Sequence, residues 1–322
     1  MSIALISPAQ ALELVGEGLR TLPFPHAPEG LYDPARYILQ LGGKRIRPSL
    51  TLLAANIFDA DPARFLQPAL AMEVFHNFTL VHDDIMDEAP LRRGADTVHI
   101  KWDLPTAILS GDLLLIEAYK LLGQAPAHTL PAVLQMFNRT AVEVCEGQQL
   151  DMDFEKQTDV TLAEYIEMVR LKTSVLLGCS LATGALCAGA SEADTDALYI
   201  FGEQLGIAFQ IMDDVLDAFP EGDTFGKKAG GDIERGKKTF LYAKAMESMK
   251  AEDRDKLLSH YGKPGAGHVD FVLDFFISNG IKNAATQAME AHFQRSLQAL
   301  GTVNGPTQVL HQLAQAVYER TF

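Results

Sequence analysis

Residues 78–87 read FTLVHDDIMD, an apolar run that ends in three aspartates, and residues 207–217 repeat the pattern as IAFQIMDDVLD. Both runs have the apolar spacing of helices, so the first and last aspartates of each motif, four residues apart, share a helix face. We refer to them as the first and second acidic motifs. The pattern predicts two helices that begin in an apolar interior and end in paired carboxylates.

The paired carboxylates require a positively charged partner. Like charges four residues apart on a helix repel, and a buried carboxylate without a partner is strongly unfavourable. One such motif would also fit a solvated acidic helix end, but its repetition after two apolar runs favours a metal. Magnesium binds one or two carboxylates together with water and phosphate oxygens, and six carboxylates facing one cavity would need roughly three divalent ions. The predicted ligands are Asp83, Asp84, Asp87, Asp213, Asp214 and Asp217.

Apolar residues recur at helical spacing through most of the chain, and alternating strand patterns are nearly absent. This predicts an all-α fold. No long or low-complexity linker interrupts the chain, which favours a single domain over residues 1–322. The expected helices are 7–20, 33–40, 48–57, 65–88, 104–122, 130–154, 162–189, 193–219, 237–248, 268–279, 282–300 and 306–319.

Charge limits the classes of partner. The chain of 322 residues is 48% hydrophobic and carries a formal net charge of −15. A strongly acidic protein repels nucleic acid and anionic lipid surfaces, so we expect no nucleic-acid partner. An anionic ligand would have to meet a local basic cluster or bridging cations.

Residues 173–190 form the least charged stretch and approach the length of a membrane span. They are rich in Gly, Ser, Thr, Cys and Ala, whose weak hydrophobicity favours a buried core helix, so we expect no transmembrane segment. The three cysteines, Cys145, Cys179 and Cys187, lack metal-ligand spacing and predict reduced, buried thiols. With no secretory signal at the amino terminus, these features indicate a cytoplasmic protein.

Basic residues cluster at four places. Residues 42–48 (GGKRIRP) place three cations around a glycine turn, and Pro48 suits the first turn of a helix. Arg92 and Arg93 follow the first acidic motif, and Lys172-Thr173 stands at a predicted helix start or turn. Each alone could be surface charge. The fourth place is the glycine-rich segment 219–238, which could close over an anion or be merely flexible, and whose lysines are Lys227, Lys228, Lys237 and Lys238.

His76 precedes Asp83 by two helical turns and shares its face. A lone histidine there is more often a structural residue. Beside a bound diphosphate it could instead donate a charge-assisted hydrogen bond.

The order of these motifs resembles that of the trans-isoprenyl diphosphate synthases, over about residues 40–245. The resemblance implies one bundle of antiparallel helices around a deep central cavity, usually as a homodimer. It implies an enzyme that joins an allylic diphosphate to isopentenyl diphosphate with three magnesium ions. The motifs are residues 43–48, His76, residues 82–87, residues 91–94, Gly111-Asp112, Gly147-Gln148 with Asp151, Lys172-Thr173, residues 209–217 and residues 226–239.

Matching by position, the resemblance implies a role for individual residues. The six aspartates would hold magnesium on the allylic diphosphate. That diphosphate would be contacted by Arg92, Lys172, Lys227 and Lys237, with Thr173 and Gln210 nearby. The diphosphate of isopentenyl diphosphate would be held by Lys44, Arg47, His76 and Arg93. The residues expected to be catalytic are Asp83, Asp84, Asp87, Arg92, Lys172, Asp213 and Lys227, with supporting polar roles for Gln148, Asp151 and Asp232.

The family sets product length by bulky side chains four and five residues before the first acidic motif, here Thr79 and Phe78. One aromatic there, without an insertion in the motif, resembles geranylgeranyl diphosphate synthases, with farnesyl or longer products as alternatives. On an ideal helix Phe78 would face nearly opposite the aspartates, so ordinary core packing is the other interpretation.

Two other functions compete with a synthase. A terpene cyclase would replace the second acidic motif and lack the 43–47 motif, and an inactive subunit of a heteromeric synthase would have lost aspartates. This chain keeps both motifs intact. It departs from the family where Thr239-Phe240-Leu241 follows Gly236-Lys237, and we expect only a slightly different helix start there.

Overall fold

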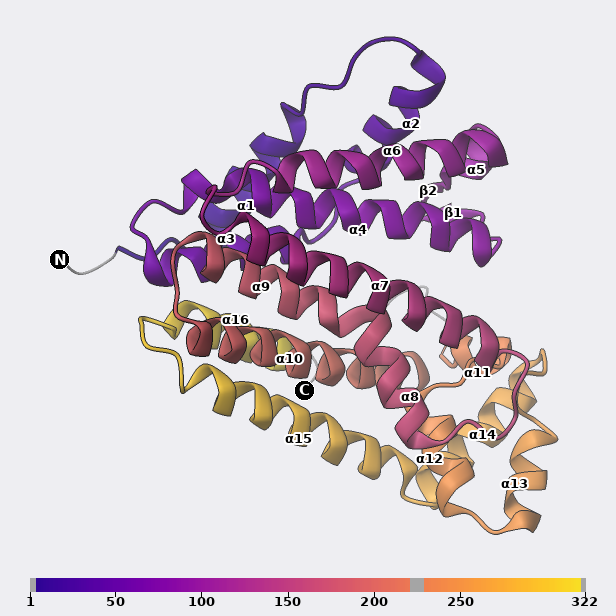
Figure 1. Cartoon of the computed structure of the whole chain (residues 1–322). Helices are drawn as coiled ribbons and strands as arrows, with labels where there is room; N and C mark the ends of the chain where they lie inside the picture. The colour runs from indigo at the N-terminus through magenta and orange to yellow at the C-terminus, as the bar shows by residue number, and fades with distance from the viewer. Residues whose placement is uncertain (1–3, 221–228, 320–322) are drawn as a thin grey trace. The chain divides into compact units, whose positions relative to one another are not determined.

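The computed structural model describes residues 4–220 and 229–319. Helices dominate this part of the chain, which confirms the predicted all-α class (Figure 1). The described residues divide into two compact units, which are treated separately below. None of the described helices is long and apolar enough to cross a membrane.

The amino-terminal unit comprises residues 1–137, 179–198 and 304–310. A short hairpin of β1 (Leu91–Arg92) and β2 (Ala95–Asp96) pairs antiparallel beyond the end of α4. Its helical elements are α1 (Pro8–Arg20), α2 (Glu29–Gln40), α3 (Ile46–Phe58), the 3-10 turn η1 (Pro62–Phe65), α4 (Leu66–Met86), α5 (Val98–Lys101) and α6 (Leu104–Leu122).

The core of this unit forms where α4 packs on α3 and α6. Nearly every side chain of α3 is buried, and α4 is buried continuously from Pro68 to Phe75. Gly184 lies so close to α3 that a Cβ atom there would stand 2.0 Å from the Thr51 carbonyl oxygen. The predicted buried helix within residues 173–190 is therefore confirmed.

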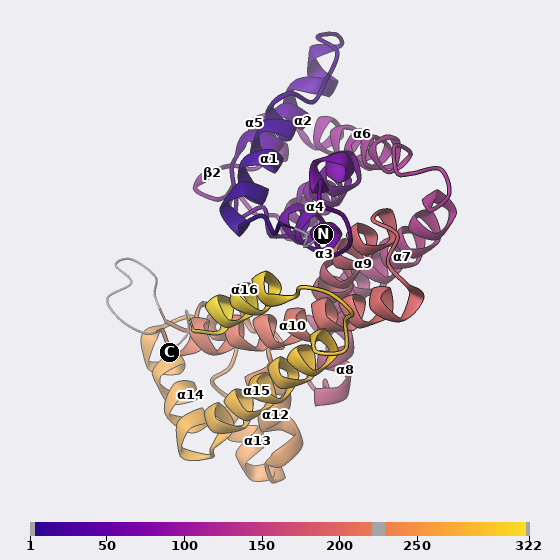
Figure 2. The ribbon, with the colours of Figure 1, turned by 90° about the vertical axis from the view of Figure 1, so that its left-hand side faces the viewer.

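The carboxy-terminal unit comprises residues 138–178, 199–303 and 311–322. Both views show α15 and α16 lying beside α10 (Figures 1 and 2), where Phe293 stacks on Tyr318 with ring centroids 4.3 Å apart. The helices α7, α9, α10 and α16 contribute residues to both units. The remaining elements are α7 (Leu130–Phe154), α8 (Leu162–Val169), the π turn η2 (Arg170–Ser174), α9 (Val175–Cys187), α10 (Glu192–Ala218), α11 (Gly231–Arg235), α12 (Phe240–Ser248), α13 (Ala251–Leu258), α14 (Ala266–Ser278), α15 (Ile281–Leu300) and α16 (Gln308–Glu319).

Most expected helices match within a few residues, and those at 104–122 and 130–154 match α6 and α7 at both ends. The helix expected at 162–189 is wrong in its middle, where a π turn separates α8 from α9. The short elements η1, α5, α11 and the hairpin were not predicted because a few residues show no periodicity. Helix α13 was missed because it is highly charged and buries only Leu257.

The prediction of three buried thiols is wrong for one of them. Cys179 and Cys187 are buried, whereas Cys145 is exposed on α7. Val142, three residues earlier on the same face of α7, is exposed as well, whereas the adjacent Val144 points away from that face and is buried. All three cysteines are free thiols.

Candidate active site

The 42–47 loop of the amino-terminal unit is shaped by backbone conformations that favour glycine. Gly42 and Gly43 have φ of 77° and 129°. Arg45 is left-handed as well, at φ 47°, and is the N-cap of α3. Its buried guanidinium donates to the Glu73 carboxylate and the Leu39 carbonyl oxygen. Arg45 therefore anchors the loop and leaves Lys44 exposed.

The hairpin turn brings a second arginine to this loop. Arg93, at φ 55°, donates a hydrogen bond to the Gly42 carbonyl oxygen. A Cβ atom on Gly43 would lie 2.8 Å from the Arg93 guanidinium, so only glycine leaves room for it. Two sequence clusters that are distant along the chain, at 42–48 and 92–94, thus meet.

Arg47 and His76 lie within the same cluster of positive charge. The Arg47 Nε atom is buried and has no hydrogen-bond partner. Burial lowers the pKa of Arg47 to about 10, and burial together with the nearby arginines holds the pKa of His76 well below 6.5. His76 is therefore neutral near pH 7 and donates through one ring N–H. The cluster is suited to an anionic ligand.

The first acidic motif ends α4. Asp84 is buried and accepts hydrogen bonds from Arg92 Nε at 2.9 and 2.8 Å, one to each carboxylate oxygen. Arg92 Nη2 lies 2.7 Å from one of the same oxygens. Asp83 is half-buried, and Asp87 is the exposed C-cap residue. The hairpin thus places a guanidinium on the middle aspartate of the motif.

The second acidic motif ends α10 and differs at the same position. Asp214 is buried and accepts from the Tyr165 hydroxyl at 2.6 Å and from the Phe240 backbone N–H at 2.8 Å. Burial raises the pKa of Asp214 to about 7. Asp213 is exposed, and Asp217 accepts from the Asp232 backbone N–H at 2.8 Å.

Tyr165 is a site residue that no sequence pattern indicated. It lies on α8, 49 residues before Asp214, and no recognised motif contains it. Phe240 begins α12, so the helix starts three residues later than expected, with Thr239 as its N-cap. The departure from the family at this point therefore coincides with a backbone contact to Asp214.

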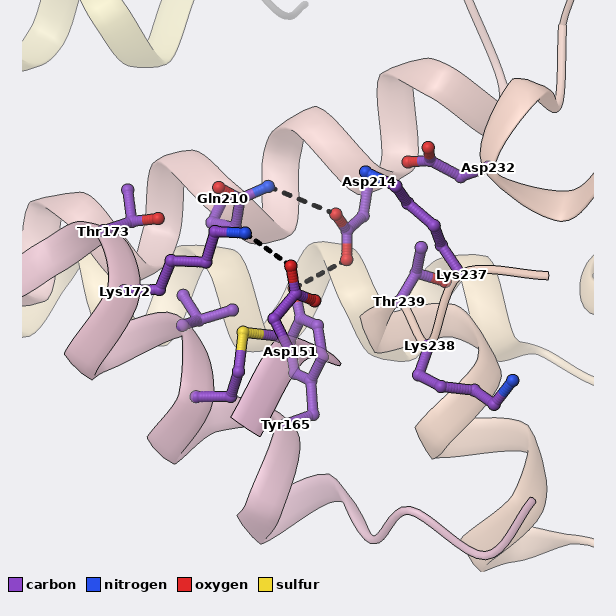
Figure 3. A pocket seen from close by; sticks show the side chains of 12 residues that line it. Asp151, Tyr165, Lys172, Thr173, Gln210, Asp214, Asp232, Lys237, Lys238 and Thr239 are labelled. Atoms are coloured by element: carbon purple, nitrogen blue, oxygen red, sulfur yellow. Dashed lines mark hydrogen bonds and ion pairs between the residues drawn. The ribbon is translucent and has the colours of Figure 1, made fainter. Parts of the chain in front are cut away.

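A pocket opens beside the second acidic motif within the carboxy-terminal unit (Figure 3). Lys172 Nζ forms an ion pair with Asp151, and Gln210 Nε2 lies 3.4 Å from Asp214 Oδ1. Lys237 is exposed and its backbone carbonyl accepts from the Tyr261 hydroxyl. The polar lining residues are Asp151, Tyr165, Lys172, Thr173, Gln210, Asp214, Asp232, Lys237, Lys238 and Thr239.

Lys172 and Thr173 were expected at a helix start or turn, and a turn is where they lie. They lie in the π turn between α8 and α9. The predicted site residue Lys227 falls in the 221–228 segment, outside the described residues.

The two predicted product-length residues lie on α4. The Phe78 ring meets the His82 ring edge-to-face at 4.9 Å and lies 5.5 Å from the Phe75 ring. The Thr79 hydroxyl donates to the His76 carbonyl oxygen at 2.8 Å. His82 in turn packs on Gly111 of α6, where a Cβ atom would stand 2.3 Å from its ring. The Gly111 motif is therefore explained by packing of α6 on α4.

The aspartates of the two acidic motifs meet some of the requirements of a magnesium site. Within residues 4–220 and 229–319, no three His, Cys, Asp or Glu side chains lie close enough together to hold a metal ion. Magnesium needs only one or two carboxylates when water and phosphate oxygens complete its shell. Asp87 and Asp213 are exposed and suit that role, and the oxygens of the buried Asp84 and Asp214 accept hydrogen bonds from protein donors.

Comparison with known proteins places these motifs in one family. Residues 28–274 match the model of the polyprenyl synthetases. The geranylgeranyl pyrophosphate synthase of Geoglobus acetivorans is 46% identical over 237 residues, which cover 73% of this chain and 74% of that one.

Solved structures agree with this match. That of geranylgeranyl pyrophosphate synthetase from Pyrococcus horikoshii has a TM-score of 0.91 at 35% identity, covering 96% of both chains. That of geranylgeranyl pyrophosphate synthase from Corynebacterium glutamicum, complexed with calcium and isoprenyl diphosphate, has a TM-score of 0.82 at 29% identity, covering 98% and 96%. The chain therefore belongs to the polyprenyl synthetase family.

Proposed function

We propose that this chain is a trans-prenyltransferase that condenses isopentenyl diphosphate with an allylic diphosphate, and that its product is geranylgeranyl diphosphate. The observation that carries the proposal is the buried Arg47 Nε, which lacks an acceptor beside Arg93 and a neutral His76. A buried donor without a partner is costly, and an anion would satisfy it.

Isopentenyl diphosphate is assigned to this basic cluster of the amino-terminal unit. Lys44, Arg47, His76 and Arg93 would bind its diphosphate. Arg45 would not, because Glu73 and the Leu39 carbonyl already occupy its guanidinium. In this assignment Arg45 sets the shape of the loop, whereas Lys44 and Arg47 would bind the ligand.

The allylic diphosphate is assigned to the pocket of the carboxy-terminal unit. Lys172 and Lys237 would donate to its oxygens, with Thr173 and Gln210 beside them. Lys172 would exchange its Asp151 partner for the ligand, and Asp232 and Gln148 would complete the polar surroundings. Arg92 and Lys227 are assigned to the same diphosphate by the family resemblance alone.

Magnesium would be held by Asp83, Asp87, Asp213 and Asp217, and the family resemblance supports three ions. When bound, the ions stabilise the charge that develops on the departing diphosphate. Of the six predicted ligands, Asp84 and Asp214 are proposed to keep their present partners and to orient the motifs. Calcium accompanies isoprenyl diphosphate in the Corynebacterium glutamicum structure, which supports a divalent ion at this family's site.

The reaction follows from these assignments. The carbon–oxygen bond of the allylic substrate breaks, and the leaving diphosphate takes hydrogen bonds from Lys172 and Lys237. The double bond of isopentenyl diphosphate attacks the allylic carbon, a carbon–carbon bond forms, and a proton is lost to the departed diphosphate. No protein nucleophile is required.

The names of the relatives support a C20 product, and Phe78 is the proposed limit on chain length. We propose that the chain functions as one domain, because α7, α9, α10 and α16 each contribute residues to both units without a linker. We propose a cytoplasmic location on the sequence features given above. A homodimer is supported by five exposed apolar side chains on α6, an unusual surface for a monomer. They are Leu104, Ile108, Leu109, Ile116 and Tyr119.

The activity is tested with purified protein, magnesium, labelled isopentenyl diphosphate and either dimethylallyl, geranyl or farnesyl diphosphate, followed by chromatography of the products. We expect geranylgeranyl diphosphate from all three primers, and none after chelation of magnesium. A cyclised hydrocarbon would identify a terpene cyclase. Absence of product from every primer would contradict the proposal and favour an inactive subunit.

A further inference from the structure

Between α8 and α9 the chain makes one π turn, Arg170–Ser174, which carries Lys172 and Thr173. The Val175 N–H donates to the Arg170 carbonyl, five residues earlier. A π turn adds one residue to the helical repeat and so rotates the residues after it by about 100°. Such turns are rare and are frequent at functional sites, so their cause in a particular protein is informative.

Two helices pack against this turn, and each has a glycine at the point of contact. On α7, a Cβ atom at Gly147 would stand 2.2 Å from the Lys172 backbone nitrogen. On α10, a Cβ atom at Gly206 would stand 2.8 Å from Cα, Cβ and Oγ of Ser174. Glycine is unfavourable in a helix interior, so a packing reason is expected at both places. The wide π turn supplies that reason.

The same two helices also hold the first residue of the turn. Arg170 Nη1 lies 3.2 Å from a Glu203 carboxylate oxygen on α10 and 3.7 Å from a Glu143 oxygen on α7. Each glutamate precedes its glycine by three or four residues, so glutamate and glycine share a helix face. Each helix thus supplies one glutamate that pairs with Arg170 and one glycine that leaves room for the turn.

The next polar residue on each of these faces lines the pocket. Asp151 follows Gly147 by four residues on α7 and pairs with Lys172. Gln210 follows Gly206 by four residues on α10 and lies beside Asp214. Both residues line the pocket with Lys172 and Thr173 (Figure 3). On both α7 and α10, the helix face that contacts the π turn therefore continues into the face that lines the pocket.

We propose that Gly147 and Gly206 are positioning residues, which admit the π turn and thereby aim Lys172 into the diphosphate pocket. The ligand assigned to that pocket rests on the proposed function, whereas the geometry of the turn does not. A methyl group at either glycine displaces the turn and separates Lys172 from Asp151.

Gly206→Ala is the main test variant, because its clash involves the Ser174 side chain as well as backbone. Gly178→Ala is the matched control: a Cβ atom there would stand 2.7 Å from the Tyr199 carbonyl oxygen, in the same pair of helices but beyond the turn. Crystal structures of both variants are compared first. We expect the Lys172–Asp151 pair to be lost in Gly206→Ala and kept in Gly178→Ala. An intact turn and pair in Gly206→Ala would overturn the inference, whatever the enzyme's activity.

Calorimetric titration with inorganic pyrophosphate and magnesium gives the functional readout. We expect Gly206→Ala to weaken binding about tenfold, Gly178→Ala to weaken it less than about twofold, and the KM for isopentenyl diphosphate to stay unchanged in both. Adding Lys172→Ala to Gly206→Ala should weaken binding little further, because both changes remove one interaction. Fully additive losses would show that Gly206 acts by packing alone. Absence of pyrophosphate binding in the unaltered protein would count against the proposed function and leave the structural comparison decisive for the turn.

Discussion

The two acidic motifs have the same pattern of aspartates, yet their buried middle residues are stabilised in different ways. Asp84 is paired with a guanidinium that a hairpin brings to it. Asp214 instead accepts from a tyrosine hydroxyl and a backbone N–H, and burial raises its pKa to about 7. The more accessible aspartates at the ends of each motif suit cations. In both motifs, one short helix end thus carries a buried aspartate that anchors it and more accessible aspartates that could bind a cation.

The largest expected effect follows from removing an outer aspartate. Asp83→Ala or Asp213→Ala should lower kcat by about a hundredfold or more, because the leaving diphosphate loses stabilisation by a bound cation. Steady-state kinetics at saturating magnesium measure this. Asp196→Ala, an exposed aspartate on the same helix as Asp213, is the control and should keep the wild-type rate. Unchanged rates in both test variants would reject the metal assignment.

The middle aspartates should differ in stability. Arg92→Ala leaves the buried Asp84 carboxylate without its cation and should lower the free energy of unfolding by about 3 kcal/mol. Tyr165→Phe removes one neutral donor from Asp214 and should lower it by about 1 kcal/mol. Urea denaturation measures both values.

A second change checks the cause. Asp84→Asn in the Arg92→Ala background should restore part of the lost stability, because it removes the unpaired charge. If Arg92→Ala and Tyr165→Phe lower the free energy of unfolding equally, and Asp84→Asn restores none of the loss, the two buried aspartates are stabilised to the same extent.

The basic cluster predicts a dependence of stability on pH. The pKa of His76 is depressed in the folded protein, so the unfolded chain binds more protons as pH falls through about 6.5. The contribution of His76 to the free energy of unfolding should therefore fall from about pH 7 to about pH 5, and His76→Gln should change the slope by this contribution. The exposed His128→Gln is the control and should leave the slope unchanged. An identical slope in His76→Gln and in the unaltered protein would contradict this prediction.

The smallest expected change concerns the product. Phe78→Ala should lengthen the main product by about one C5 unit, with little loss of rate, if its ring limits the chain. Chromatography of products from a farnesyl diphosphate primer measures this, with Phe275→Ala on α14 as the half-buried aromatic control. An identical product would leave Phe78 as a packing residue against Phe75 and His82.

Much of the fold could be predicted because its long helices carry strong apolar periodicity, as in α6 and α7. The π turn could not, because the pattern around Lys172 is the same for α and π winding. The ordered motifs were sufficient to predict the two acidic helix ends, and the roles of the basic residues stay predictions. The anchoring contacts of Tyr165 to Asp214 and of Arg45 to Glu73 join residues far apart in sequence, and only tertiary structure brings them together.

A crystal structure with manganese in place of magnesium and inorganic pyrophosphate tests the division of roles within each motif most directly. Anomalous scattering would locate each ion, and the diphosphate would show which cations it contacts. We expect ions on Asp83, Asp87, Asp213 and Asp217, with Asp84 still on Arg92, Asp214 still on Tyr165, and pyrophosphate against Lys172. Ions bound directly to Asp84 and Asp214, with those partners displaced, would contradict this expectation.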